Sequence, residues 1–322
     1  MCEAVSIAWW NTGISPAVKR DRSTPEELDV AFALITNILM SHNVDILCLG
    51  EISPSDIKVL EEIFSEKGFI IYDGTFTEGS IKHDMCILIK LATFTYIDSK
   101  SIVEQSLLGA VRAGQEVQLM HNNSGDHFFF YISHWPMRGN DSNEEMPKRY
   151  ELGKALRGAI SRCIEEKSGK YFILLGDYND DPFNKSITHA LGATRDRDLV
   201  VKKDIFLYNP FWNFMGASIS FPSEDHHLST YGTYYYSGGA VTRWHTFDQI
   251  IFSSSFISGG DWNLLEDEVK IINDEVFKNL VTSPKTNFDH LPVIAVITRG
   301  QKNGFQKFIS CRVRGSQKSK IK

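Results

Sequence analysis

The sequence contains no uninterrupted apolar run of the roughly 18 residues that a membrane-spanning helix needs. Its first residues, MCEAVSIAWWN, also lack the basic segment, the long apolar segment and the small-residue cleavage site of a secretory signal. They are typical of a strand instead. We therefore expect no membrane as a partner and a cytoplasmic location.

Cysteine is scarce, with five residues in 322, and no two of them form a CxxC pair. This spacing supports neither a zinc knuckle nor a disulfide framework. Cys48 and Cys86 lie in apolar, strand-like runs, and Cys163 lies on the apolar stripe of a predicted helix. We expect all three to pack in the core, as reduced cysteines commonly do.

A basic excess is also absent, because the net charge is −6. Proteins that grip long duplex DNA through its phosphates usually carry such an excess or a basic stripe. The one basic concentration is the tail, residues 300–322, which contains no acidic residue. This tail is either a solvated segment or a nucleic-acid contact, with the solvated reading favoured.

What the sequence does contain is an alternation of short apolar runs with helical patterns. Thr24, Pro25 and Glu27 form a capping box that begins a helix, a second helix follows Ser53-Pro54, and a third spans about 144–166. The strand-like runs are residues 6–10, 44–50, 69–74, 84–90, 127–134, 170–177, 246–253 and 292–298.

Many strands and a few long helices, with no repeat or linker before the tail, predict one α/β domain over residues 1–299. The architecture that we expect is a four-layer α/β/β/α sandwich. In it, two mostly antiparallel sheets pack together and are flanked by helices.

Acidic, amide and histidine side chains interrupt the ends of these strands at six places. They are Asn11, Glu51, His134, Asp177 with Asn179, Asp248, and Asp289 with His290. One such residue is commonly an exposed strand end, but six places with this chemistry indicate a convergent site.

These residue types suit one chemistry. Hard oxygen ligands bind Mg²⁺ or Mn²⁺, and histidines stabilise or protonate phosphoryl oxygens. The sequence has no GxSxG, no P-loop and no HExxH. The pattern therefore predicts a divalent-metal-dependent phosphoesterase.

The order of these motifs resembles the endonuclease/exonuclease/phosphatase (DNase I-like) family over residues 1 to about 299. The matching segments are Trp10-Asn11, Leu49-Gly50-Glu51, Ser133-His134, Gly176 to Asn179 (GDYN), Phe247 to Ile250 (FDQI) and Asp289-His290. Each match is weak alone, but GDxN followed by a late DxI and a DHxPV is specific.

The resemblance implies a role for each matched position. Glu51 would be the principal metal ligand, with Asn11 and Asp289 completing the shell around Mg²⁺ or Mn²⁺. Asp177 would orient or deprotonate the attacking water, and Asn179 would hold a phosphate oxygen.

The same resemblance implies that His290, aligned by Asp248, stabilises the pentacovalent phosphate. It implies that His134 contacts the phosphate near the leaving group and pairs with a carboxylate from a neighbouring strand. Asp84 is the candidate partner, with a plain acid at a strand start as the equal alternative.

Two departures from the family pattern bear on substrate positioning. Phe288 stands where serine is usual before the terminal Asp-His, and Gly50 stands where glutamine is common. Neither departure removes a ligand, so we still expect activity.

Substrate recognition depends on an aromatic insertion, residues 208–244. Trp212 is a candidate stacking surface for unpaired bases, although Trp212 and its aromatic neighbours could instead fill the core. Arg138 and Arg243 are candidate phosphate contacts. His226 and His227 are expected to lie in a surface loop rather than in a second metal site.

We therefore predict a nuclease or nucleotide phosphodiesterase with nucleic acid or a nucleotide as substrate. A lipid or inositol phosphate phosphoesterase is the enzymatic alternative. A non-catalytic binding module on the same fold is the third, and it would predict gaps among the site positions, which the sequence does not have.

Overall fold

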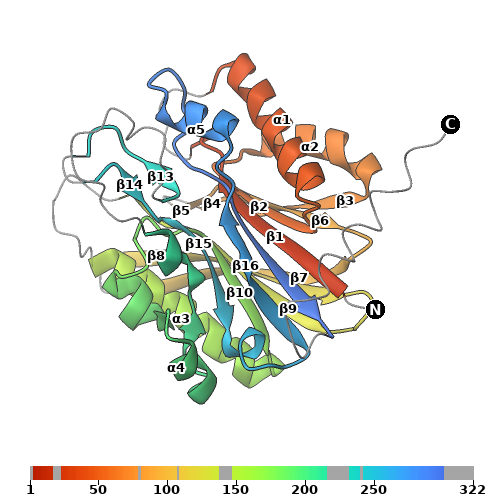
Figure 1. Cartoon of the computed structure of the whole chain (residues 1–322), viewed down its shortest axis with the longest axis vertical. Helices are drawn as coiled ribbons and strands as arrows, with labels where there is room; N and C mark the ends of the chain where they lie inside the picture. The colour runs from red at the N-terminus through yellow and green to blue at the C-terminus, as the bar shows by residue number, and fades with distance from the viewer. Residues whose placement is uncertain are drawn as a thin grey trace.

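The computed structural model describes residues 3–16, 23–78, 81–106, 109–137, 147–215, 232–239 and 242–300. It contains two large sheets that pack face to face, with helices on both outer sides (Figure 1). The six-stranded sheet has the order β16 (Trp262–Ile271), β17 (Val293–Arg299), β1 (Glu3–Asn11), β2 (Ile46–Gly50), β6 (Met85–Lys90), β3 (Phe69–Asp73).

The seven-stranded sheet has the order β11 (Ala193–Thr194), β12 (Leu207–Tyr208), β15 (Asp248–Ser253), β10 (Tyr171–Asp177), β9 (His127–His134), β8 (Gly109–His121), β7 (Phe94–Ser106). Among the described strands of the two large sheets, the parallel pairs are β1–β2, β9–β10 and β11–β12. The prediction of two mostly antiparallel sheets is confirmed.

Alternation along the strands divides the apolar residues into three cores. Val5, Ile7 and Trp9 of β1 face the other sheet and pack against residues of β9, β10 and β15. Ala8 and Trp10 face the opposite way, toward α1 (Pro25–Ser41), α2 (Pro54–Phe64) and α5 (Glu275–Thr282). A third core joins the outer face of the seven-stranded sheet to α3 (Pro147–Lys167). These cores give the four layers that the sequence predicts.

Local signals explain where the helices begin. Both hydrogen bonds of the Thr24–Glu27 capping box form, and Ser53 with Asp56 makes a second box at the start of α2. The predicted start of the third helix near residue 144 lies outside the described residues, and α3 begins at Pro147. A short helix, α4 (Arg197–Lys202), follows Asp196 as its N-cap.

The structure adds elements that the sequence patterns did not predict. They are the long hairpin of β7 and β8, the edge strand β16, and two small sheets made by β4 (Phe76–Glu78) with β5 (Ile81–His83) and by β13 (Tyr234–Tyr235) with β14 (Trp244–His245). The short turns η1 (Ser65–Lys67), η2 (Ser186–Leu191), η3 (Pro210–Phe214) and η5 (Ser254–Phe256) complete the described elements.

Cys48, Cys86 and Cys163 are buried and free, as predicted. Among the described residues, no helix is long and apolar enough to cross a membrane.

Candidate active site

The predicted site residues meet at one edge of the two packed sheets. Parallel strands β1 and β2 end beside each other at Asn11 and Gly50, and parallel strands β9 and β10 end together at His134 and Asp177. Strand β15 runs the other way and begins at Asp248, which pairs with Asp177. The site is thus built from the ends of strands in both sheets.

Asp177 lies at the centre of this group. Its Oδ2 accepts hydrogen bonds from Asn11 Nδ2 and Asn179 Nδ2, both at 3.2 Å, and its Oδ1 accepts one from the Asn179 backbone at 2.8 Å. The preceding Gly176 is required here, because a Cβ at that position would overlap the Ser133 backbone of β9. Asn179 of the GDYN segment and Asn11 of β1 therefore hold both oxygens of Asp177.

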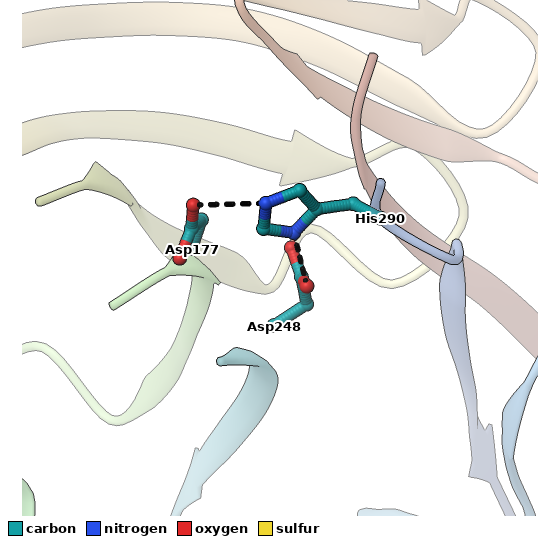
Figure 2. A group of neighbouring side chains, drawn as sticks. All are labelled: Asp177, Asp248 and His290. Atoms are coloured by element: carbon teal, nitrogen blue, oxygen red, sulfur yellow. Dashed lines mark hydrogen bonds and ion pairs between the residues drawn. The ribbon is translucent and has the colours of Figure 1, made fainter. Parts of the chain in front are cut away.

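His290 is oriented by its contact with the buried side chain of Asp248. Its Nδ1 lies 2.7 Å from Asp248 Oδ2, and its Nε2 points to Asp177 Oδ2 at 3.6 Å (Figure 2). The indole Nε1 of Trp9 donates to the other Asp248 oxygen at 2.7 Å. Ligand atoms of Asp177, Asp248 and His290 lie within 4.8 Å of one another, the spacing of a possible metal site. Since both Asp248 oxygens are already hydrogen-bonded, we interpret Asp248 as the aligning partner of His290.

His134 forms a second pair on the opposite side of Asp177. Its Nδ1 lies 2.9 Å from Asp84 Oδ1, and its Nε2 lies 3.8 Å from both Glu51 Oε1 and Asp177 Oδ2. Asp84 is therefore placed where a partner of His134 is required. Burial raises the pKa of Asp84, but His134, with a smaller contribution from Arg112 of β8, outweighs it and lowers the pKa.

The predicted metal ligands lie beside Asp177 and His290. They are Glu51, Asn11 and Asp289. Asn11 Nδ2 donates to Glu51 Oε1 at 3.3 Å, and Asp289 Oδ1 lies 3.8 Å from His290 Nε2. The Asp289 side chain keeps 47% of its exposure, so its oxygens remain accessible. Glu51 and Asn179 have left-handed backbones, with φ of 54° and 50°. Strain of this kind persists where the surrounding structure imposes it, often at functional sites.

The buried charges shift the pKa values of these groups. Burial lowers the pKa of His134, but the carboxylates of Asp84, Asp177 and Glu51 outweigh it and raise the pKa to about 10. In the same way burial is outweighed at His290, whose pKa is held well above its ordinary value by Asp248 and Asp177. The surrounding carboxylates therefore favour the protonated form of both imidazoles.

The pKa values of the carboxylates are also raised, but here burial is the cause. Burial raises the pKa of Glu51 and of Asp177, and the neighbouring imidazolium groups oppose the rise. Burial also raises the pKa of Asp289, to about 6, with Glu51 and Asp177 adding to the effect of burial. Because the Asp289 side chain is nearly half exposed, solvent moderates that shift.

The two departures from the family pattern have structural reasons. A Cβ at Gly50 would lie 2.8 Å from the Trp9 ring, so glycine makes room for the indole that bonds Asp248. Phe288 stacks on Trp10 with ring centroids 6.0 Å apart, and Trp10 Nε1 donates to the His290 carbonyl. Trp9 thus supports Asp248, and Trp10 supports the backbone of His290.

The predicted substrate contacts are less clearly placed. Phe211 is buried in the core between the sheets, whereas Trp212 is partly buried, with the Arg195 guanidinium 4.9 Å from its ring centroid. Arg243 is exposed beside the β13–β14 hairpin. Base stacking on Trp212 and phosphate contact by Arg243 remain predictions. Arg138, His226, His227 and the tail after residue 300 lie outside the described residues.

Several residues of the site were not predicted from the sequence. Trp9 and Arg112 are two of them, and Tyr234 is a third, with its ring centroid 4.7 Å from that of His290. Asp181 and His245 are two more. They lie 3.1 Å apart, and their contact joins the loop after Asn179 to β14. The strand alternation of SIAWWN could have pointed to Trp9, which shares the face of Asn11, but no sequence signal linked it to Asp248.

Comparison with known proteins gives one family and a set of similar folds. A family model described as "Endonuclease/Exonuclease/phosphatase family" matches residues 33–289. No curated protein matches the sequence.

Solved structures share the fold at low sequence identity. The human Nocturnin catalytic domain with bound sulfate has a TM-score of 0.62 and 15% identity, covering 92% of this chain and 95% of that one. D. rerio TDP2 complexed with single strand DNA product has a TM-score of 0.57 and 15% identity, covering 91% and 98%. The mannosyl-6-phosphatase Bt3783 of Bacteroides thetaiotaomicron has a TM-score of 0.55 and 15% identity, covering 91% and 99%.

Proposed function

Because this chain belongs to the endonuclease/exonuclease/phosphatase family, we propose that it is a divalent-metal-dependent phosphodiesterase that hydrolyses phosphodiester bonds of nucleic acid or nucleotides. The observation that carries the proposal is the convergence of two Asp–His pairs on one oxygen. His290 Nε2 and His134 Nε2 lie 3.6 Å and 3.8 Å from Asp177 Oδ2. A carboxylate base between two cationic donors suits in-line attack of water on a phosphodiester.

The ligand chemistry fits Mg²⁺ or Mn²⁺. Glu51 and Asp289 offer carboxylate oxygens and Asn11 an amide oxygen, which are the hard ligands that these ions prefer. Burial raises the pKa of Glu51 and of Asp289 even though neighbouring imidazoles oppose the rise, so further positive charge would stabilise both carboxylates in the ionised form. A bound divalent ion would supply that charge and neutralise the charge on the phosphate.

The other side chains activate the water, hold the phosphate and stabilise or protonate its oxygens. Asp177 takes the proton of the attacking water, with its second oxygen fixed by the Asn179 backbone. Asn179 Nδ2 donates to the Trp135 carbonyl at 2.8 Å and to Asp177 at 3.2 Å, and a phosphate oxygen would replace the longer bond. His290 stabilises charge on the phosphoryl oxygens, and His134 protonates the leaving oxygen.

The substrate that we propose is short or single-stranded. A net charge of −6 disfavours a long grip on duplex DNA, which depends on neutralising many phosphates. A protein of similar fold, D. rerio TDP2, was solved with a single strand DNA product. The aromatic insertion offers Trp212 for stacking and Arg243 for phosphate contact.

A substrate panel tests this proposal. The protein, with Mg²⁺ or Mn²⁺, is incubated with single- and double-stranded DNA, RNA, bis(p-nitrophenyl) phosphate, phosphoinositides and sphingomyelin. We expect metal-dependent cleavage of single-stranded polynucleotides, and its loss with EDTA. Cleavage that survives EDTA would refute the metal requirement. Turnover confined to lipids would refute the nuclease assignment and favour the lipid alternative.

A matched pair of variants links the activity to the site. Asp177→Asn should lower kcat by roughly 10²–10⁴-fold, as expected for loss of a general base. Asp204→Asn, an exposed acid in a turn, makes the same chemical change away from the site and should leave kcat unchanged. Equal activity of the two variants would contradict the role of Asp177.

A further inference from the structure

The short strand β13 attaches directly to the segment that carries Asp289 and His290. Tyr234 bridges to His290 in an antiparallel pair. Tyr235 donates its backbone N–H to the Asp289 carbonyl at 2.9 Å, and Leu291 donates to the Thr233 carbonyl at 2.6 Å. The β13–β14 hairpin lies on the side of the molecule away from the amino terminus of β1 (Figure 1). Its position therefore depends on the same backbone as the catalytic histidine.

Consecutive residues of β13 point to opposite sides of this attachment. Tyr235 packs into the core between the six-stranded sheet and helices α1, α2 and α5, with its ring centroid 5.1 Å from that of Trp244. Tyr234 turns to the site, where its ring centroid lies 4.7 Å from that of His290. The negative charges of Asp289, Asp177 and Glu51 all act on its hydroxyl. The phenol ring thus lies beside His290, whose Nε2 is 3.6 Å from Asp177 Oδ2 and 3.8 Å from Asp289 Oδ1.

The hydroxyl of Tyr234 makes no side-chain hydrogen bond with the residues that the structure describes; the side chain is partly buried, and its hydroxyl is not one of the fully buried atoms without a partner. A phenol in such surroundings usually finds an acceptor. Burial, and then the charge of Asp289, raises the pKa of this phenol above its ordinary value. An acceptor that enters the site from outside the chain can therefore take this hydrogen bond.

A stack of rings fixes the direction of this donor. Tyr234 stacks on Phe247 at 5.1 Å, and Phe247 stacks on His245 at 4.8 Å. His245 is in turn held by Asp181, whose other oxygen accepts the Thr246 backbone N–H at 2.7 Å. Because each ring is packed on the next, the hydroxyl is positioned before substrate binds.

We propose that the Tyr234 hydroxyl donates a hydrogen bond to a non-bridging oxygen of the phosphoryl group under attack, beside His290. This assignment rests on the proposed function, since it requires a phosphoryl group at the site. It makes Tyr234 a substrate-contacting residue.

The test compares two tyrosine-to-phenylalanine changes in adjacent residues. Tyr234→Phe removes the hydroxyl and keeps the ring stack. Tyr235→Phe makes the same change on the opposite side of the strand. With Mg²⁺ and bis(p-nitrophenyl) phosphate, we expect Tyr234→Phe to lower kcat/KM by about 10- to 100-fold, the range for a hydrogen bond to a charged group. Tyr235→Phe should keep the wild-type value.

Two further readouts separate phosphoryl contact from a structural role. Orthovanadate, a mimic of the pentacovalent phosphate, should bind Tyr234→Phe more weakly by a similar factor, as measured by calorimetry with Mg²⁺ present. The Mg²⁺ concentration for half-maximal rate should not change. Wild-type kcat/KM in Tyr234→Phe, or a loss that extra Mg²⁺ restores, would overturn the proposal.

The vanadate experiment also distinguishes failure of the two ideas. A wild-type protein that binds vanadate but hydrolyses no phosphodiester would refute the proposed function. In that case weaker vanadate binding by Tyr234→Phe still supports the contact, and unchanged binding overturns it. Equal loss with p-nitrophenyl and phenyl esters is expected for a non-bridging contact. A larger loss with the phenyl ester would assign the hydroxyl to the leaving oxygen instead.

Discussion

Replacing Asp248 with asparagine perturbs the site at its most buried point. The Asp248 side chain has no exposed area, and its two oxygens each accept one donor at 2.7 Å, from Trp9 Nε1 and from His290 Nδ1. An asparagine has one carbonyl oxygen, so its NH₂ group must face one of these donors. If it faces His290, the ring must present Nδ1 as an acceptor and cannot be cationic.

The magnitude follows from these bonds. Loss of a charge-assisted hydrogen bond costs about 1.5–3 kcal/mol, and a buried donor left without an acceptor adds about 1–3 kcal/mol. We therefore expect Asp248→Asn to lower the free energy of unfolding by roughly 3 kcal/mol. In the serine-protease example of the same Asp→Asn change next to a histidine, kcat falls about 10⁴-fold. We expect kcat/KM here to fall by about 10²–10⁴-fold.

The pH dependence provides the diagnostic measurement. Asp248 is the first of the carboxylates that raise the pKa of His290. Without it the pKa falls, so the cationic form should survive only at lower pH. The residual activity of Asp248→Asn should therefore decline at a lower pH than that of the wild type, in a profile of log kcat/KM against pH.

Trp9→Phe is the control, because it removes the other donor to Asp248 and leaves the His290 bond intact. It should destabilise the fold, since Trp9 is fully buried, but keep kcat/KM within a few fold. The reasoning would be refuted if Asp248→Asn kept wild-type kcat/KM, or if Trp9→Phe lost as much activity.

Two other predictions concern stability. Gly50→Ala places a Cβ 2.8 Å from the Trp9 ring, and overpacking of this kind should cost about 1–3 kcal/mol in urea unfolding; an unchanged midpoint would show that Trp9 moves freely. For His83, burial and then Arg112 lower the pKa from 6.5 to about 3. Its contribution is therefore present above pH 6.5 and is lost as pH falls toward 3, by about 2 kcal/mol at pH 5. The difference in unfolding free energy between pH 7 and pH 5 should shrink by that amount in His83→Leu, and an identical difference would contradict the shift.

The fold was predictable where burial dominates the sequence pattern. Runs such as residues 170–177 and 292–298 are apolar on both faces, because each strand is covered by the other sheet and by helices on its outer face. The hairpin of β7 and β8 escaped prediction for the opposite reason. Segments such as SIVEQS in β7 carry exposed polar residues at the edge of the sheet, so their composition does not differ from that of a loop.

The site was predictable in so far as its residues follow strands. Parallel pairing of β1 with β2 and of β9 with β10 brings their last residues together, as the polar residues at the strand ends suggested. Contacts that join distant segments were not predictable. Trp9 and Asp248 are 239 residues apart, and Tyr234 belongs to a two-residue strand inside an aromatic insertion, which is too short for any periodicity.

Because the site residues come from two separate layers, the proposed catalysis depends on how the two sheets pack against each other. Asn11 ends a strand of one sheet and His290 lies just before β17 of that sheet, whereas Asp177 and Asp248 belong to the other sheet. The hydrogen bonds Asn11–Asp177 and His290–Asp248 therefore cross between the two. Either sheet can keep its own ladder of backbone bonds while the layers slide or separate, and circular dichroism would register little. The rate of hydrolysis would vanish first, because no single layer holds a complete set of groups.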